Sequence, residues 1–236
     1  YNLIFINFMI SDKKVLCIIP ARKGSKGLIN KNIKIFNKKP LIYWTINEAN
    51  KSKYIDRCIV STDCTNIQKI AINCGAEAPF LRPKEISGDN ASIYDAISFT
   101  LKKIRDKFDI IILLQPTSPL RTFKDINKCF EMMVKQEASS IVSITKLPYP
   151  YEWILKKDKN KKIKFTSKKY ISLRQKTKNY YKSNGAIFIS TIQKFNKNKK
   201  FYTNDTCGYE MPIDKSIDID SLLDFKIAEF LYKKNK

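Results

Sequence analysis

The sequence KVLCIIPARKGSKGLINKN, residues 14–32, decides the fold, because an unbroken apolar run stops within it and gives way to a polar loop. Residues 15–19 are β-branched or otherwise apolar, which is typical of a strand buried on both faces of an α/β sheet. Pro20 ends that strand. The following loop contains two glycines and four basic residues, so its backbone can close on a ligand while its cations neutralise one. We therefore predict that a polyphosphate binds this loop.

The spacing of the loop excludes two common phosphate-binding motifs. It is neither G-x-x-x-x-G-K-[ST] nor G-x-G-x-x-G, since G-S-K-G stands here between an upstream arginine and a downstream Lys-Asn pair. A basic surface turn is the alternative interpretation, because lysine is abundant throughout the chain. Composition alone, however, would not set Pro-Ala-Arg directly against the end of a buried strand, where α/β sheets hold their ligands.

The composition indicates a globular protein with one large α/β domain. The chain has 236 residues, of which 43% are hydrophobic and 28% charged, and this length leaves room for a small insertion. A formal charge of +23 raises the hypothesis of a basic nucleic-acid-binding module. Because the lysines are scattered through every segment among many Asn and Ile residues, we interpret the charge as a compositional bias and predict no nucleic-acid partner.

Cysteine and histidine usage restricts the chemistry. The six cysteines form no C-x-x-C pair, and several lie in apolar runs, so we interpret them as reduced thiols and predict a cytoplasmic protein. The chain has no histidine, which excludes histidine-dependent catalytic triads and histidine metal sites. Any metal must therefore bind oxygen ligands.

The N-terminal stretch YNLIFINFMI is apolar but too short to span a membrane, and it lacks a basic n-region and a small-residue cleavage site. We predict an N-terminal extension over residues 1–13, with Met9 as an alternative start and an extra edge strand as the competing interpretation. No other stretch approaches membrane length, so we predict no membrane association.

Strand and helix patterns alternate along the rest of the chain, which predicts a mainly parallel sheet with helices on both faces. The predicted helices cover residues 40–50, 65–74, 92–107, 122–136 and 222–232. The predicted strands cover residues 56–63, 76–81, 109–114, 140–145, 184–190, 207–213 and 215–220. Residues 146–178 break this pattern with two prolines, several aromatic residues and a dense lysine run, so they form an excursion from the domain, for which a solvated hairpin is one interpretation.

Two acidic residues near the C-terminus form the candidate metal site. Asp218 and Asp220 are one residue apart on a predicted strand, so both would project from the same face. Like charges at that separation repel unless a cation lies between them, and Mg²⁺ prefers oxygen ligands completed by water and phosphate. A solvated acidic face is the alternative.

Five stretches carry a resemblance to a known family. They are IIPARKGSKGLINKN (18–32), LRPKEISGDNAS (81–92), LLQPTSPLR (113–121), RQKTKNYYKSNGAIFIS (174–190) and SIDIDSLLDFKIAE (216–229). Together they resemble the CMP-N-acylneuraminate (CMP-sialic acid) synthetases, in the family's order, and the resemblance covers the chain from about residue 15 to its end.

The resemblance implies a three-layer, Rossmann-like nucleotide-diphospho-sugar transferase fold over residues 14–236. It also implies that the insertion at about 146–178 is a dimerisation arm reaching over the active site of the second subunit in a homodimer. The implied reaction joins a nine-carbon 2-keto acid sugar to CMP from CTP, with Mg²⁺ as cofactor, releasing pyrophosphate and supplying surface glycan synthesis. Synthetases of CMP-legionaminate or CMP-pseudaminate are the alternative.

A bound CTP gives the loop residues specific roles. The predicted nucleotide-binding residues are Arg22, Ser25, Lys26, Gly27, Lys31, Asn32, Arg82 and Ser92. In the loop, an arginine fork and lysine point charges would stabilise the departing pyrophosphate. Asn32 would bond a phosphate or ribose oxygen, or else order the turn. By resemblance Arg82 and Ser92 hold cytosine and ribose, and Ser92 also fits a helix N-cap. We interpret Lys23 as a bystander.

The remaining assignments concern the sugar, the metal and the reaction. The resemblance implies that Gln115 aligns the anomeric hydroxyl, while Thr117 and Ser118 either share that environment or fix a two-proline turn. The predicted sugar-binding residues are Gln115, Lys146, Arg174, Gln175, Tyr181 and Asn184. The S-x-D-I-D motif assigns the metal to Asp218 and Asp220. The predicted catalytic residues are Arg22, Lys31, Gln115 and Asp220, with proton removal by Asp220 or through a metal-bound water.

Overall fold

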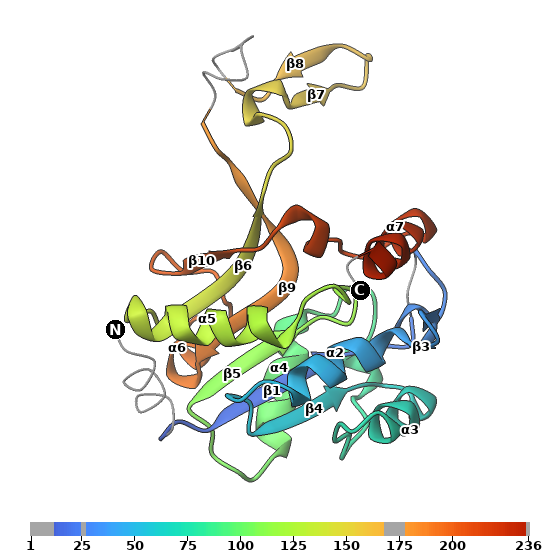
Figure 1. The fold of residues 1–236 in the computed structure, drawn as a ribbon, viewed down its shortest axis with the longest axis vertical. Coiled ribbons are helices and arrows are strands. Elements are labelled where there is room, and N and C mark those ends of the chain that lie inside the picture. Colours follow the sequence, from blue (N-terminus) through green and yellow to red (C-terminus); the bar gives the residue numbers. More distant parts are fainter. Residues whose placement is uncertain (1–11, 25–26, 168–177, 235–236) are drawn as a thin grey trace.

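A six-stranded mixed sheet forms the centre of the molecule in the computed structural model, which describes residues 12–24, 27–167 and 178–234 (Figure 1). The strand order is β10-β6-β9-β5-β1-β4. These strands are β1 (Val15–Pro20), β4 (Arg57–Ser61), β5 (Ile110–Leu114), β6 (Ser140–Lys146), β9 (Tyr181–Thr191) and β10 (Cys207–Glu210). Within this sheet β9 alone runs antiparallel to both of its neighbours. The prediction of a mainly parallel α/β sheet is confirmed.

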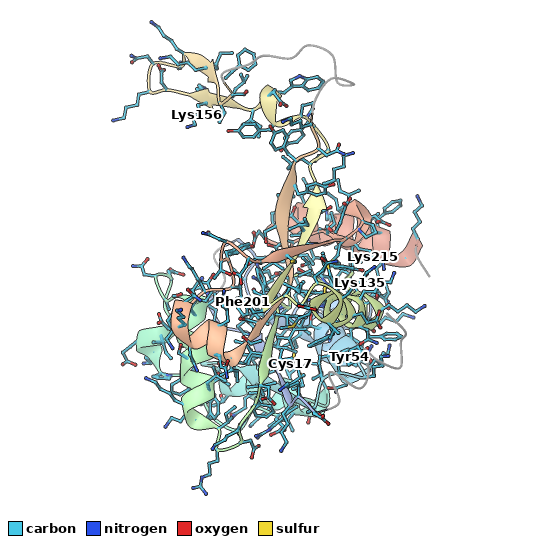
Figure 2. All side chains as sticks on the ribbon, turned by 90° about the vertical axis from the view of Figure 1, so that its left-hand side faces the viewer. Cys17, Tyr54, Lys135, Lys156, Phe201 and Lys215 are labelled. Atoms are coloured by element: carbon cyan, nitrogen blue, oxygen red, sulfur yellow. The ribbon has the colours of Figure 1, made fainter. Side chains whose placement is uncertain are left out.

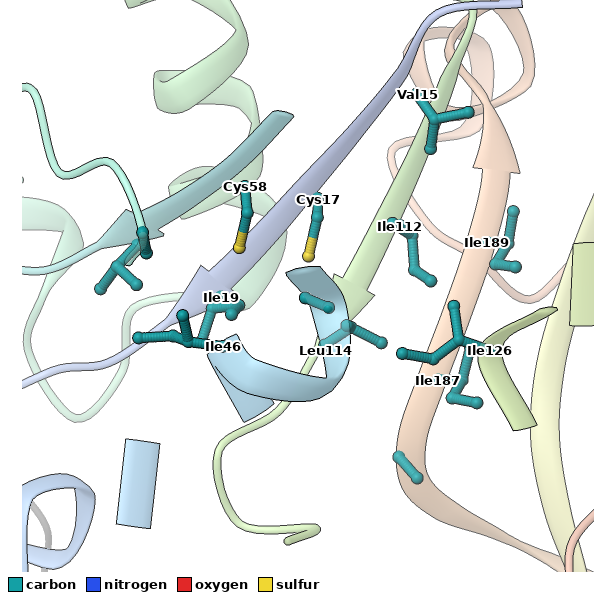
Figure 3. Packing of buried hydrophobic residues seen from close by; sticks show 14 of the residues in the cluster. Val15, Cys17, Ile19, Ile46, Cys58, Ile112, Leu114, Ile126, Ile187 and Ile189 are labelled. Atoms are coloured by element: carbon teal, nitrogen blue, oxygen red, sulfur yellow. The ribbon is translucent and has the colours of Figure 1, made fainter. Parts of the chain in front are cut away.

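Helices cover both faces of the sheet, which gives three layers. Three helices pack on one face, α2 (Leu41–Asn50), α3 (Thr65–Asn73) and α5 (Phe123–Lys135), and two on the other, α4 (Ile93–Lys103) and α6 (Ile192–Asn198). Alternate residues of β1 point to opposite layers: Cys17 and Ile19 face the first three helices (Figure 3), whereas Ile18 faces α4. All five apolar residues of β1 are fully buried, as expected for a central strand.

Two predicted strands are wrong. Residues 76–81 form only isolated bridges, in which Glu77 pairs with Ile59 and Leu81 with Thr62. Residues 215–220 are not a strand. The chain turns there through the short 3₁₀ helix η5 (Ile213–Lys215), which begins directly after Pro212, and continues as a loop. Proline supplies no N–H for a ladder hydrogen bond, which favours this break. The predicted C-terminal helix is confirmed as α7 (Leu222–Lys234).

Short elements follow the glycine loop (residues 21–24 and 27–32) and pack it against the C-terminal helix. The loop passes into η1 (Lys31–Ile33), β2 (Ile35–Phe36) and β3 (Lys39–Pro40), and a second 3₁₀ helix, η2 (Lys84–Ile86), precedes α4. Phe36 is fully buried against Phe225 of α7, with the two ring centroids 5.5 Å apart. This small core fixes α7 beside the glycine loop. It therefore also fixes residues 216–220, which precede α7 and which we call the acidic segment.

A hairpin stands away from the body of the molecule, and we call residues 147–167 the arm (Figures 1 and 2). β6 and β9 extend out of the sheet as its root, and the arm contains η3 (Tyr151–Trp153), β7 (Leu155–Lys157) and β8 (Ile163–Phe165). The pairs Leu155–Phe165 and Lys157–Ile163 lie on one face of the hairpin, and Lys156–Lys164 lies on the other. The first face therefore carries three exposed apolar side chains and one lysine, and the second is basic. The arm lies within the predicted excursion.

The described part of the chain contains no helix that combines the length and the apolar character needed to cross a membrane. All six cysteines lie in described ranges and carry free thiols. Most of the predicted N-terminal extension lies outside the described residues.

Candidate active site

A cavity of about 390 Å³ opens beyond the carboxyl ends of β1 and β5. It is lined by the glycine loop, by the segment between residues 82 and 93, by the turn after β5 and by the acidic segment. Eight predicted site residues line it, namely Arg22, Gly27, Lys31, Asn32, Arg82, Ser92, Gln115 and Asp220. The glycine loop near the start of the chain and the acidic segment near its end therefore share one cavity. Ser25, Lys26, Arg174 and Gln175 lie outside the described residues.

Direct contacts join the glycine loop to the acidic segment. The ammonium of Lys31 donates to the carbonyl of Ile219 at 2.7 Å and forms an ion pair with Asp220 Oδ1 at 2.8 Å. The Lys31 side chain is 13% exposed and that of Asp220 is 79% exposed, so a shielded cation holds a carboxylate that faces solvent. A Cβ on Gly27 would overlap the carbonyl of Asp220, so this close approach requires glycine.

Arg22 and Asn32 lie on the side of the cavity that the glycine loop forms. Arg22 Nη1 donates to the Gly88 carbonyl at 2.8 Å and pairs with Asp89 Oδ1 at 3.1 Å. Asn32 is buried, and its amide donates to the carbonyl of Arg22 at 3.0 Å. Asn32 therefore orders the turn that carries Arg22, which is one of its two predicted roles, and a direct nucleotide contact stays a prediction.

Arg82 and Ser92 line the opposite wall. Arg82 is buried, and its Nε donates to the Ser87 hydroxyl at 3.0 Å. Burial lowers the pKa of Arg82, and the neighbouring Asp63 carboxylate opposes this effect. Ser92 is the N-cap of α4, since its hydroxyl accepts from the Tyr94 N–H at 3.1 Å. The capping role exists in the structure, while a nucleotide contact by the same hydroxyl stays a prediction.

Gln115, Thr117 and Asp218 converge beside Gly185 of β9. A Cβ on Gly185 would lie 3.3 Å from Asp218 Oδ2 and 3.6 Å from Gln115 Oε1, and the residue has a φ of +74°. Glycine is required here for both the space and the left-handed backbone. The Thr117 hydroxyl donates to Gln115 Oε1 at 3.4 Å, and Thr117 also opposes the rise in the pKa of the Asp218 carboxyl by favouring its charged form.

The acidic pair projects from a loop, and its donor set fits Mg²⁺. Asp218 is open to solvent on one side, yet desolvation by the protein around it raises its pKa, and the negative charge of Asp220 raises it further. Across the described residues, no three acidic or cysteine side chains gather into a closed metal site. Asp220 lines the cavity and Asp218 lies two residues before it, and two such carboxylates suit an ion that takes its other ligands from water and phosphate.

The predicted sugar-binding residues on β6 and β9 do not line this cavity. Lys146 and Tyr181 pair directly across the root of the arm. The Asn184 amide is buried and makes four contacts: it accepts from the Ser143 hydroxyl and the Ala186 N–H, and donates to Ser216 and to the Met211 sulfur. These contacts use its hydrogen-bonding capacity within the protein. A sugar contact by any of the three stays a prediction.

Arg121 is a structural residue that the sequence did not identify as such. It is fully buried, donates to the carbonyls of Ala186 at 2.8 Å and Gln115 at 3.3 Å, and donates to the Thr45 hydroxyl at 2.7 Å. Desolvation lowers the pKa of Arg121 to about 10. Arg121 therefore holds the end of β5, and with it Gln115, against β9 and α2.

Three curated proteins similar to this chain are named as cytidylyltransferases or as a CMP-sugar synthase. A protein of Escherichia coli O18:K1:H7, named N-acylneuraminate cytidylyltransferase, is 34% identical over 94% of this chain and 52% of its own length. CMP-N,N′-diacetyllegionaminic acid synthase of Legionella pneumophila is 32% identical, covering 94% and 98% of the two chains. Pseudaminic acid cytidylyltransferase of Campylobacter jejuni is 30% identical, covering 94% and 97%. This chain therefore spans about half of the first relative and nearly all of the other two.

Solved structures agree on the fold. CMP:2-keto-3-deoxy-manno-octonic acid synthetase complexed with CTP superposes with a TM-score of 0.69 at 16% identity, covering 94% of this chain and 100% of that one. 4-Diphosphocytidyl-2C-methyl-D-erythritol synthase from Anaerococcus prevotii gives 0.63 at 12% identity, covering 94% and 99%. At these identities the likeness establishes the fold alone. The model of the cytidylyltransferase family matches residues 16–236. The chain belongs to the cytidylyltransferase family and is a nucleotidyltransferase.

Proposed function

We propose that this enzyme joins a nine-carbon acidic sugar of the N-acylneuraminate class to CMP from CTP, releasing pyrophosphate, for surface glycan synthesis. The observation that carries this proposal is the single cavity in which Arg22 and Lys31 meet Gln115 and Asp220. Cations on one side suit a triphosphate, and an amide beside two carboxylates suits the attacking hydroxyl. The names of the similar proteins support the same reaction.

The chain's own residues account for binding and charge stabilisation. Arg22 and Lys31 face the phosphates and stabilise the charge that develops on the departing pyrophosphate. Gln115 orients the anomeric hydroxyl in line with the α-phosphorus, so that positioning lowers the barrier. Asp220 offers its second carboxylate oxygen as proton acceptor, while Lys31 holds Oδ1. When bound by Asp218 and Asp220, Mg²⁺ would supply Lewis-acid polarisation of the α-phosphate.

Legionaminate or pseudaminate is the second candidate substrate. This chain spans 98% of the Legionella relative and 97% of the Campylobacter relative, but 52% of the E. coli one. These two relatives are named for legionaminic and pseudaminic acid, which makes these sugars the alternative substrates.

We further propose a cytoplasmic homodimer. The free thiols support a reducing compartment. The exposed apolar face of the hairpin supports self-association, because an isolated two-stranded hairpin is marginally stable in water.

Pyrophosphate release tests the reaction and the sugar together. The protein is mixed with CTP and Mg²⁺, and with N-acetylneuraminate, legionaminate or pseudaminate in turn. We expect release with at least one sugar, little release with UTP, and none without sugar. Absence of release with all three sugars would contradict the proposal, and the preferred sugar decides between the two candidates.

A further inference from the structure

Thr117 lies between two groups that the proposed reaction requires. Its hydroxyl donates to Gln115 Oε1 at 3.4 Å and also favours the charged form of the neighbouring Asp218 carboxyl. Its carbonyl accepts the Ile219 N–H at 2.9 Å, so its backbone also holds the acidic segment. Thr117 is 9% exposed and lines the cavity. The same residue therefore contacts the turn after β5 and the acidic segment through separate atoms.

The hydroxyl has one proton and two facing acceptors. A carboxylate is a stronger acceptor than an amide oxygen, so rotation of the hydroxyl would move its proton from Gln115 to Asp218. The Gln115 contact of 3.4 Å is long beside the usual O–H···O separation of about 2.7–2.8 Å. An amide oxygen and a hydroxyl oxygen then face each other without a proton between them, whereas a half-turn of the amide would place an N–H donor there.

We propose that Thr117 is a positioning residue that orients both groups, an inference that rests on the proposed function. Its proton fixes the Asp218 carboxylate, and its oxygen accepts a hydrogen bond from Gln115 Nε2. The amide oxygen of Gln115 then points away from Thr117, where it accepts the hydrogen bond of the attacking sugar hydroxyl. That bond aims the lone pair of the hydroxyl at the α-phosphorus.

The space around these groups limits other arrangements. A Cβ on Gly185 would contact both the Asp218 carboxylate and the Gln115 amide, so β9 closes one side of this cluster. Arg121 holds the Gln115 carbonyl at 3.3 Å and fixes the residue's backbone. The remaining freedom of Gln115 lies in its side chain, which the Thr117 hydroxyl can control.

Kinetics of three variants test the role. Thr117→Val removes the hydroxyl and keeps the shape. We expect kcat to fall about 30-fold with the KM for CTP within about twofold, because the lost contact orients the sugar hydroxyl and leaves the nucleotide site intact. Thr117→Ser should restore kcat to within about threefold of wild type. Ser118→Ala is the matched control, since Ser118 Oγ is buried and finds no hydrogen-bond partner among the described residues.

A spectroscopic measurement on the metal-free protein separates this role from a general loss of structure. The side-chain NH₂ signal of Gln115 is assigned by its absence in Gln115→Met in ¹H–¹⁵N spectra. We expect one of its protons to exchange slowly with solvent in wild type and Thr117→Ser, and rapidly in Thr117→Val.

Wild-type kcat in Thr117→Val, an equal loss in Ser118→Ala, or no rescue by serine would overturn the proposal, as would an unchanged Gln115 signal. If wild type turns over none of the sugars, the proposed function fails, and the amide signal still reports whether Thr117 orients Gln115.

Discussion

Lys31 is the cation whose removal most directly tests the site. Its ammonium contacts both Ile219 and Asp220, so its loss releases the acidic segment and also removes the proposed phosphate contact. We expect Lys31→Ala, and likewise Asp220→Ala, to lower kcat/KM at least about a hundredfold, as loss of a transition-state charge contact can. Lys23→Ala is the control, because that side chain is exposed and should be dispensable. Near-normal turnover of Lys31→Ala would show that its role is misassigned.

Two glycines of the same loop should respond differently to alanine. A Cβ on Gly27 would overlap the Asp220 carbonyl, whereas a Cβ on Gly24 would meet nothing within 4 Å. We expect Gly27→Ala to lower the free energy of unfolding by about 1–3 kcal/mol, because the loop or the acidic segment must shift. Gly24→Ala should change it by less than about 0.5 kcal/mol. Denaturant unfolding of both variants measures the difference, and equal values would contradict this packing.

The negative charges of Asp218 and Asp224 should change the free energy of unfolding in opposite directions. Desolvation raises the pKa of Asp218 above its ordinary 3.8. As pH rises, Asp218 therefore loses its proton at a lower pH in the unfolded chain than in the folded protein. The contribution of Asp218 to the free energy of unfolding is fully present below pH 3.8 and is lost as pH rises through the folded-state pKa. The pKa of Asp224 is lowered, chiefly by a hydrogen bond from Ser221. Its contribution is present above 3.8 and is lost as pH falls through the folded-state pKa.

In the presence of a chelator at neutral pH, we expect Asp218→Asn to raise the midpoint of thermal unfolding and Asp224→Asn to lower it. Both differences should shrink at about pH 3, where the carboxyl groups become protonated. A lower midpoint for Asp218→Asn at neutral pH would show that its charge is not destabilising in the folded protein.

At the scale of secondary-structure elements, Ser92 both caps the N-terminus of α4 and lines the cavity. Ser92→Ala removes the hydrogen bond to the Tyr94 N–H and should cost about 1 kcal/mol of stability. Ser92→Asp keeps a capping oxygen but places a negative charge in the cavity. We expect its stability to be near that of wild type and its KM for CTP to rise about tenfold. Equal KM values in Ser92→Asp and wild type would place the nucleotide away from this helix end.

Hydrophobic periodicity predicted most elements, and tertiary context explains the failures. The alternation of Ile217 and Ile219 with acidic residues resembles a strand that is buried on one face. In the structure, Ile219 is instead buried in the cluster beneath α7, and its N–H bonds the Thr117 carbonyl. The sequence offers no local signal for that docking. The antiparallel direction of β9 is likewise set by the long excursion that precedes it.

A residue's place at the cavity can be predicted from local sequence where the residue follows a strand end, whereas the contacts between distant segments cannot. Gln115 directly follows β5, so its place at the cavity is expected for an α/β sheet. The Lys31–Asp220 pair joins residues 189 positions apart and depends on how α7 docks. The network around Asn184 similarly depends on Ser216, which comes from a different segment.

At the scale of the whole molecule, the exposed side chains of the arm lead us to predict a dimer. Leu155, Ile163 and Phe165 are exposed on one face of the hairpin, which they share with Lys157, and the paired residues Lys156 and Lys164 occupy the other. We expect wild type to sediment as a dimer of 27.5 kDa chains. Replacing Leu155 and Phe165 together by serine should weaken the dimer at least about tenfold, because buried apolar anchors dominate interfaces. Replacing Lys156 and Lys164 together by serine is the control, and equal dimerisation of the two variants would contradict this assignment.

β9 is a single strand with one end in the arm and the other in the core. Tyr181 pairs with Lys146 at the root of the arm, and four residues further along Gly185 abuts the carboxylate of Asp218. One continuous strand thus links the base of the hairpin to the proposed active site. In the proposed homodimer, a displacement of the hairpin by its partner would therefore reach the same strand that borders Asp218.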